Sequence, residues 1–392
     1  MYGFRKPFTA ATYETDPFEP GIKASLVGAQ VLGYMLSKFI GIKVISEMTA
    51  ERRAIALLGL IGVAQLALVA FGLVPPSLKM ACLFLNGIPL GMIYGLVVGF
   101  LEGRRLTEAF VAGLCASFIF ASGLVKSVGA WLLLRGFSEA WMPATAGMIF
   151  ILPLILFVGM LTQIPKPSAE DLEERAPREP MTGADRWGWI RRHGLGLGCV
   201  IIGFLMITIL RTLRDDFAVE LWSALGTSGE PSIFALSETL VMVMVTVIAG
   251  VVVIIRNNHR ALLTSLAMGI VGFGLVVFAL LGLKSDSLTG FHFMVLTGLG
   301  LYLPYVVVHT TVFERLVALT RDKGNMAYLM YLADSAGYLG YVALLFFGGF
   351  LKSEMALLER YQTICWAVAI VGILSFLGAL LVYRRAPLTA NR

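Results

Sequence analysis

The sequence predicts an all-α polytopic membrane protein built from two helical bundles, and three observations support this fold class. Of its 392 residues, 58% are hydrophobic and only 14% are charged. The mean hydropathy of +0.82 and this composition are not those of a soluble domain. About eleven apolar stretches are long enough to cross a hydrocarbon layer of roughly 30 Å as helices. One long polar segment divides them into two groups.

The apolar stretches follow one another along the chain with mostly short polar connections. Each is long enough for a membrane-spanning helix, which satisfies its own backbone hydrogen bonds in lipid. They lie near residues 23–42, 54–74, 80–101, 107–134, 141–163, 194–213, 232–255, 261–283, 290–313, 326–350 and 362–383.

The longest polar segment runs from Pro165 to Arg192 and mixes charged residues with four prolines. Such a composition favours a solvated linker. We therefore predict four regions, which are an N-terminal helical bundle (1–163), a cytoplasmic linker (164–193), a C-terminal helical bundle (194–385) and a cytoplasmic tail (386–392).

Five apolar stretches precede the linker and six follow it, one short of a symmetrical arrangement. Met1 opens directly onto Tyr2-Gly-Phe-Arg-Lys-Pro-Phe8, which reads like the outer end of a helix. Transporter folds are commonly built from internal repeats. We therefore expect two six-helix bundles whose first helix is missing or truncated, and a gene product that begins upstream of Met1.

The orientation follows from the basic residues in the loops. Lys and Arg are roughly twice as frequent in one alternating set of loops as in the other, and short basic loops stay in the cytoplasm. The basic set includes Arg52 and Arg53, the central linker, and Arg384. The linker and the C-terminus are therefore predicted to be cytoplasmic.

Charged and titratable residues interrupt the apolar stretches. A charge at the bilayer centre costs about 2.5–3.5 kcal/mol on insertion scales, so such residues usually face a bundle interior or an aqueous cavity. This predicts a polar route for a solute. The residues are Lys126, Arg211, Arg214, Asp215, Glu238, His309 and Asp334.

The basic residues suit an anionic solute, because Arg offers a bidentate fork to phosphate or carboxylate and Lys a point charge. Two alternatives stay open. Arg211 and Asp215 are spaced i, i+4 on one helix and would neutralise each other, and Arg214 would snorkel to the membrane interface. The predicted substrate-binding residues are Arg5, Lys6, Lys126, Arg211 and Arg214.

Two carboxylates and one histidine are candidates for proton coupling, namely Glu238, Asp334 and His309. Desolvated carboxyl groups can accept a proton in the working range. The alternative for the two acids is a structural hydrogen bond or a salt bridge between helices. A lone histidine in an apolar helix is more often a hydrogen-bonded packing residue.

A further group of charged residues lies mostly in the predicted cytoplasmic loops. A charge relay between helices there would act as a gate that breaks and reforms as the halves rock. Anchoring to anionic headgroups explains the arginines equally well. The predicted gating residues are Lys38, Glu47, Arg52, Arg53, Glu102, Arg104, Arg105, Glu314 and Arg315.

Enzymatic motifs do not occur in the sequence. It has no Gly-Lys-Ser/Thr phosphate loop, no His-Glu-x-x-His pair and no Gly-x-Ser-x-Gly elbow, and its four cysteines lie singly in apolar stretches. We therefore expect no enzyme, no cofactor and no metal site. The expected partners are a small solute and membrane lipids, without nucleic acid, for a monomeric protein.

The segment Gly33-Tyr-Met-Leu-Ser-Lys-Phe-Ile-Gly-Ile-Lys43, followed by Glu47 and Arg52-Arg53, resembles the signature of the major facilitator superfamily between its second and third helices. This chain has Glu47 where the usual pattern has an Asp closer to the glycine. Tyr2-Gly-Phe-Arg-Lys6 and Ser37-Lys-Phe39 are distantly similar to the organophosphate/inorganic phosphate antiporters.

Over nearly its whole length the chain resembles an uncharacterised bacterial family of unknown function within that superfamily. The residues that carry this likeness are Glu102-Gly-Arg-Arg105, Phe313-Glu-Arg315, Asn325 and Asp334-Ser-Ala-Gly-Tyr338. The resemblance implies a major-facilitator-like fold in a bacterial plasma (inner) membrane, and it supplies no substrate.

The sequence as a whole predicts a secondary active transporter that works by alternating access on a small solute. The basic residues favour an organic anion, carried by exchange or proton coupling. Two other classes of function stay open, a nontransporting membrane receptor or sensor and a lipid flippase.

Overall fold

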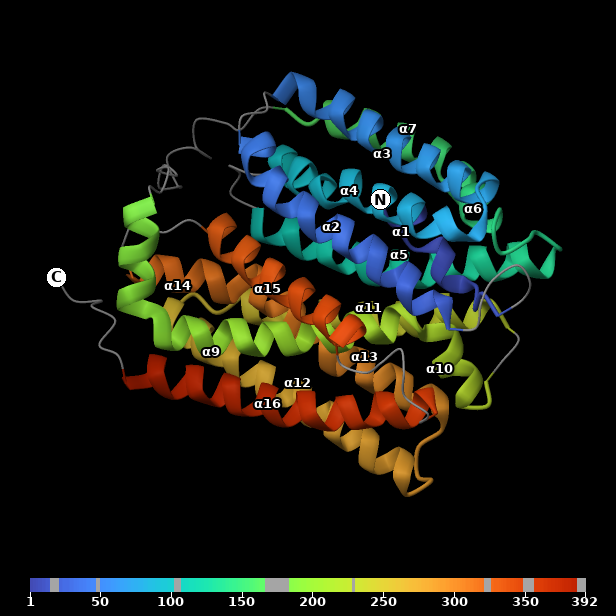
Figure 1. The fold of residues 1–392 in the computed structure, drawn as a ribbon. Helices are drawn as coiled ribbons and strands as arrows, with labels where there is room; N and C mark the ends of the chain where they lie inside the picture. The colour runs from blue at the N-terminus through green and yellow to red at the C-terminus, as the bar shows by residue number, and fades with distance from the viewer. Residues whose placement is uncertain are drawn as a thin grey trace.

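The computed structural model describes residues 1–14, 21–46, 50–101, 107–165, 183–227, 230–320, 326–347 and 356–385. All regular secondary structure in these ranges is helical, and the long helices run roughly side by side (Figure 1). The prediction of an all-α polytopic fold is confirmed.

The first half of the chain, residues 1–165, begins with two short helical segments and continues with long helices. The short segments are α1 (Tyr2–Arg5) and the 3-10 helix η1 (Pro7–Ala10). The others are α2 (Ile22–Ser46), α3 (Ala50–Leu73), α4 (Pro76–Leu101), α5 (Thr107–Leu134), α6 (Met142–Ile149) and α7 (Ile151–Thr162).

The second half, residues 183–385, begins with α9 (Gly183–Asp216), which starts ten residues before the predicted end of the linker (193 − 183 = 10). A π-helical turn, η2 (Val308–Val312), joins two of its helices. The others are α10 (Ala218–Ala224), α11 (Ser232–Val253), α12 (Asn258–Lys284), α13 (Gly290–Val307), α14 (Phe313–Thr320), α15 (Met326–Phe347) and α16 (Leu357–Arg385).

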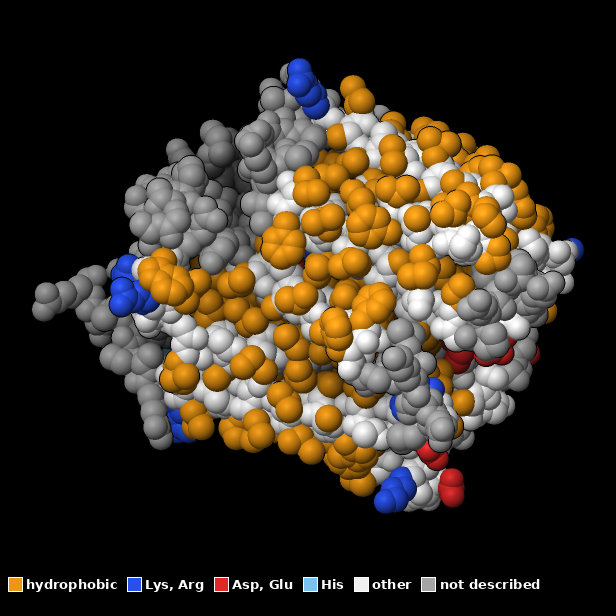
Figure 2. Space-filling view, in the orientation of Figure 1, with side chains coloured by type: hydrophobic (Ala, Val, Ile, Leu, Met, Phe, Trp, Pro, Cys, Tyr) orange, Lys and Arg blue, Asp and Glu red, His pale blue; other side chains and the backbone are white. Residues whose placement is uncertain are grey.

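The described residues contain nine helices long and apolar enough to cross a membrane, or ten if α6 and α7, bent by 41°, form one span. Helix α2 is 25 residues long and carries Lys23, Gln30 and Lys38, which lower its hydropathy. With α2 included, a helix occupies each of the predicted apolar stretches. Large apolar side chains such as Leu152, at 77% exposure, cover the outside (Figure 2). This is an integral membrane protein.

Glycines let helices of the first half touch backbone to backbone. A Cβ atom added to Gly87 would lie 2.2 Å from the Gln30 carbonyl oxygen, and one added to Gly33 would lie 2.2 Å from that of Phe84. Such contacts exclude any side chain, and small residues commonly allow close helix packing in membranes. Helices α2 and α4 are therefore held tightly together.

The two halves meet where α5 packs against α11 and α2 packs against α15 (Figure 1). Gly123 of α5 lies against α11 so closely that an added Cβ would be 2.3 Å from the Phe234 carbonyl oxygen. Helix α13 of the second half also contacts α5. Lys38 of α2 and Lys126 of α5 form ion pairs across this boundary, with Asp334 and Asp215 respectively.

Candidate functional site

A cavity lies between the two halves, and we call it the central cavity. Aromatic rings and a few charged groups line it, which is the usual composition of a small-molecule site. The first half contributes Met1, Tyr2, Arg5, Tyr34, Lys38, Tyr94 and Phe118, and the second half contributes Tyr305, His309, Asp334 and Tyr338.

Arg5 reaches the central cavity from the short helix α1. Its side chain is buried, and its guanidinium carbon lies 3.9 Å from the ring centre of Tyr34 and 5.8 Å from that of Tyr338. Among the described residues no carboxylate pairs with this guanidinium, and its Nε has no hydrogen-bond partner. In the described part of the chain, the buried positive charge of Arg5 thus lies against aromatic faces.

Hydrogen bonds to the backbone hold α1 in place. Asn86 donates through Nδ2 to the carbonyl oxygens of Phe4 (3.0 Å) and Ala64 (2.9 Å). Gln30 donates through Nε2 to the carbonyl oxygen of Arg5 (2.9 Å) and to the Asn86 side chain (2.7 Å). Both amides thus contact the backbone of α1 and each other.

Arg211 approaches from the opposite half, on α9. Its guanidinium carbon lies 4.5 Å from the ring centre of Tyr305 and 5.8 Å from that of Tyr302. Within the described residues it too has no ion pair, and its Nε has no hydrogen-bond partner. The alternative that Asp215 neutralises Arg211 is wrong, because Asp215 binds two lysines instead.

Lys38 forms an ion pair with Asp334 across the boundary between α2 and α15. Lys38 was predicted as a gating residue inside the apolar stretch 23–42. It is buried within α2 and lines the central cavity, and its gating role stays a prediction.

His309 lies in the π-helical turn η2. Its Nδ1 donates a hydrogen bond to the Tyr305 carbonyl oxygen at 3.1 Å, while Nε2 lies 3.6 Å from Oδ1 of Asp334. Single π turns are frequent at functional sites. Asp334 thus faces both Lys38 and His309, and the structure brings two predicted proton-coupling residues together.

A second group of charged side chains joins the two halves. It lies near the end of the bundle that carries η1 and α10. We call this end the outer end, and it lies opposite the C-terminus (Figure 1). Lys6 pairs with Asp215 (2.6 Å) and with Asp216, and Lys126 pairs with Asp215. Ser122 also donates to Asp215. These side chains are buried.

Two further contacts extend this outer network. Tyr341 of α15 donates to Oδ2 of Asp216 at 3.0 Å, and Lys23 of α2 pairs with Glu220 of α10 at 2.5 Å. The sequence analysis assigned no role to Lys23, Asp216, Glu220 or Tyr341. The adjacent acids Asp215-Asp216, at the end of a long apolar helix, are the sequence feature that could have predicted this network.

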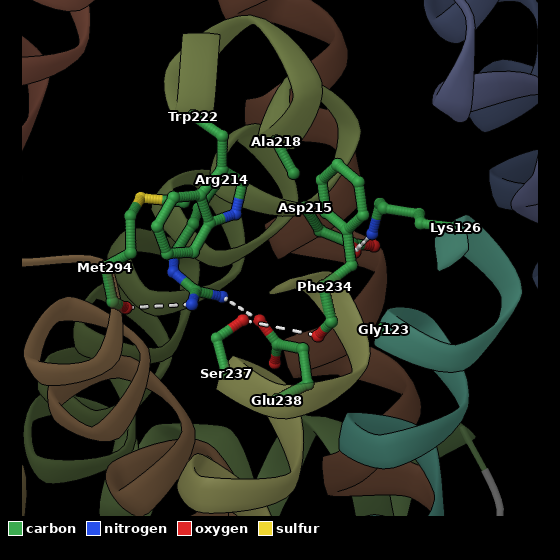
Figure 3. Close-up of a pocket in the computed structure, with 10 residues that line it drawn as sticks. All are labelled: Gly123, Lys126, Arg214, Asp215, Ala218, Trp222, Phe234, Ser237, Glu238 and Met294. Carbon is green, nitrogen blue, oxygen red and sulfur yellow. Dashed lines mark hydrogen bonds and ion pairs between the residues drawn. The ribbon is translucent and has the colours of Figure 1, made fainter. Parts of the chain in front are cut away.

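A smaller cavity lies beside the outer network (Figure 3). In it Arg214 donates through Nη1 to Glu238 at 2.7 Å and through Nη2 to the Met294 carbonyl oxygen at 2.8 Å. Arg214 does not snorkel to an interface, because its side chain is buried. Glu238 lies here, away from Asp334 and the central cavity.

The structure therefore divides the five predicted substrate-binding residues into two groups. Lys6, Lys126 and Arg214 are engaged with carboxylates, whereas Arg5 and Arg211 have no such partner among the described residues.

The predicted gating residues form no single described cluster. Arg52 is exposed, Arg53 donates to the Gly99 carbonyl oxygen, and Arg315, next to Glu314 on α14, donates to Asn258 at 2.7 Å. The remaining four, Glu47, Glu102, Arg104 and Arg105, lie outside the described residues. In the part of the chain that is described, no group of three His, Cys, Asp or Glu side chains is placed to hold a metal ion.

Solved structures of transporters share this architecture. The crystal structure of a D-xylose-proton symporter matches with a TM-score of 0.58 at 15% identity, covering 96% of this chain and 94% of that one. The nucleoside transporter NupG, solved as a mutant, matches with a TM-score of 0.59 at 14% identity, covering 97% and 95%. At these identities the matches show the fold, which is that of major facilitator transporters.

No curated protein matches the sequence. Residues 7–386 match a sequence family described as "Family of unknown function (DUF5690)". That match covers nearly the whole chain, and the protein therefore belongs to this family.

Proposed function

We propose that this protein is a secondary active transporter of a small organic anion, and that Arg5 and Arg211 compensate the charge of the solute. One observation carries the proposal. Two buried arginines, one from each half, stack on tyrosines that line the central cavity, Arg5 on Tyr34 and Arg211 on Tyr305, and no described carboxylate pairs with either.

The charge balance around the central cavity supports an anion. Lys6, Lys38, Lys126 and Arg214 each have a carboxylate partner, whereas no described carboxylate forms an ion pair with Arg5 or Arg211. An unpaired charge buried away from water costs several kcal/mol. An anion with one or two negative charges, such as a carboxylate or phosphate ester, would remove that cost and gain bidentate hydrogen bonds.

The contacts between the halves support alternating access. Ion pairs close the outer end, where Lys6, Lys126 and Lys23 of the first half meet Asp215, Asp216 and Glu220 of the second. A solute entering there has to separate these groups. With the orientation predicted from the loops, this closed end faces away from the cytoplasm.

Proton coupling or exchange is the proposed driving force, and Asp334 is its best-placed carboxylate. It lines the same cavity as Arg5 and contacts Lys38. A proton on Asp334 would release Lys38 to the anion, so that proton and anion would favour each other's binding. Glu238 binds Arg214 and lines the smaller cavity instead of the central cavity in which we place the solute.

The test uses the purified full-length protein reconstituted in liposomes. A panel of labelled carboxylates, phosphate esters, sugars and amines is tested for binding by thermal shift and for uptake with and without an inward proton gradient. We expect anions alone to stabilise and cross. Arg211→Met should abolish both effects, whereas Arg135→Met, an exposed arginine beside Trp131, should change neither.

The other two classes of function give different results. A receptor would bind an anion that never crosses the membrane. A flippase would move lipid and ignore water-soluble anions. Uptake of an anion that survives Arg211→Met would show that the site is misplaced.

A further inference from the structure

One wall of the central cavity has no charged side chain. It is formed by Met1 and Tyr2 near α1, Tyr94 of α4 and Phe118 of α5. The rings of Tyr2 and Phe118 are stacked with centres 5.6 Å apart and 24° between their planes, and Tyr94 meets Phe118 edge-on at 5.7 Å. These three rings form one continuous aromatic surface.

Tyr94 lines this cavity, and its hydroxyl group is unsatisfied among the described residues. This hydroxyl is buried. A buried tyrosine hydroxyl usually finds a partner, because leaving it unpaired costs about 1–3 kcal/mol. This hydroxyl is therefore available to a polar group on a ligand in the cavity.

The charged residues of the same cavity lie in contact with one another. Arg5 stacks on Tyr34 and Tyr338, and Lys38 lies 5.3 Å from the ring centre of Tyr34 while pairing with Asp334. The cavity thus combines a region for a negative group with an aromatic wall that includes Tyr94, whose hydroxyl is unsatisfied among the described residues. A bare inorganic anion would use only the first of these.

From this combination we infer that the solute is an aromatic anion whose ring bears a hydrogen-bonding substituent. The inference rests on the anion transport proposed above. The acidic group lies at Arg5 and Arg211, the planar ring packs against Tyr2, Tyr94 and Phe118, and the substituent pairs with the Tyr94 hydroxyl.

The experiment compares two matched series of probes on the full-length protein, one of carboxylates and one of phosphates. The first is benzoate, 3- and 4-hydroxybenzoate and cyclohexanecarboxylate. The second is inorganic phosphate, phenyl phosphate and 4-hydroxyphenyl phosphate. Calorimetry gives the Kd of each for the wild type, for Tyr94→Phe and for Tyr383→Phe. Tyr383 is the control, because its hydroxyl also lacks a described partner but does not line the cavity.

We expect a hydroxylated ring to bind about tenfold more tightly than its unsubstituted parent, the gain of one hydrogen bond. The planar ring of benzoate should bind about fivefold more tightly than cyclohexanecarboxylate through aromatic contacts. Tyr94→Phe should remove the tenfold difference while leaving the Kd of the unsubstituted rings unchanged. Tyr383→Phe should change nothing.

Two negative outcomes are distinguishable. If inorganic phosphate binds as tightly as phenyl phosphate, or if Tyr94→Phe preserves the preference for the hydroxyl, the aromatic subsite is wrong while the anion site stands. If no anion of either series binds, the proposed anion transport fails and the subsite fails with it.

Discussion

Lys6 and Asp215, which lie 209 residues apart in the sequence (215 − 6 = 209), form a buried ion pair of 2.6 Å between the two halves of the protein. Lys126 shares the same carboxylate from α5. Asp215 is thus the acceptor that ties both lysines to α9. This arrangement makes it the central residue of the closed outer end.

Replacing this acceptor should loosen the outer end. In Asp215→Asn, both lysines lose their charged partner, and breaking a buried ion pair costs about 3–5 kcal/mol. We expect a lower Tm and faster labelling of Cys115 by a water-soluble maleimide. Cys115 is buried on α5, one turn before Phe118, which lines the central cavity. The labelling is done in a background in which the other three cysteines are replaced, so that Cys115 alone can react.

The control is Asp286→Asn, in an exposed turn. Its φ of 52° suits Asn as well as Asp, so neither Tm nor labelling should change. Unchanged labelling of Cys115 in Asp215→Asn would mean that the ion pairs do not close this end.

Two arginines one turn apart on α9 should respond in opposite ways to the same substitution. Arg211→Met removes a buried charge that has no described carboxylate partner, so Tm should stay constant or rise while anion binding is lost. Arg214→Met leaves Glu238 unpaired, so Tm should fall, at a cost of about 3–5 kcal/mol. A marked loss of Tm in Arg211→Met would indicate that Arg211 is structural.

Much of the fold could be predicted from the sequence, because membrane-spanning helices leave a direct signal in their length and hydropathy. The boundaries of the helices were harder to predict from the sequence. Helix α9 begins at Gly183, inside the segment expected to be a linker, because prolines and charges upstream of it hide the start of the helix.

The candidate site was predictable in its residue types but not in its pairing. Spacing of i, i+4 suggested that Arg211 and Asp215 neutralise each other, yet such helical pairs contribute only about 0.2–0.5 kcal/mol. The actual partners, Lys6 and Lys126, come from other helices. Sequence spacing carries no information on contacts that form only when the halves pack together.

The pair of Lys38 and Asp334 should show strong energetic coupling. Lys38→Met and Asp334→Asn each leave one buried charge unpaired, whereas the double variant removes both. Residues in one such network usually couple by about 0.5–3 kcal/mol, so the double variant should be more stable than the sum of the single losses implies. Chemical denaturation of the four proteins measures this coupling.

A comparison pair lies at the outer end. Lys23 and Glu220 are also in contact, but the Glu220 side chain is 19% exposed against 11% for Asp334. Water screens such a pair more, so the same cycle should give coupling below about 1 kcal/mol. If the coupling energy between Lys38 and Asp334 is no larger than this, the two residues are not a tightly linked pair in the cavity.

The contact between α5 and α11 should tolerate no added side chain at Gly123. An alanine Cβ there would lie 2.3 Å from the Phe234 carbonyl oxygen and 2.8 Å from Cβ of Glu238, so the helices have to separate. Overpacking of this kind costs about 1–3 kcal/mol. Gly123→Ala should therefore lower Tm and speed the labelling of Cys115.

Gly113, ten residues earlier on the same helix (123 − 113 = 10), is the matched control, because nothing lies within 4 Å of its added Cβ. Alanine is favoured over glycine inside a helix by about 0.5–1 kcal/mol, so Gly113→Ala should raise Tm slightly and leave labelling unchanged. If Gly123→Ala behaved in the same way, α5 and α11 would not be the contact that holds the halves closed, and the ion pairs of Asp215 alone would have to do so.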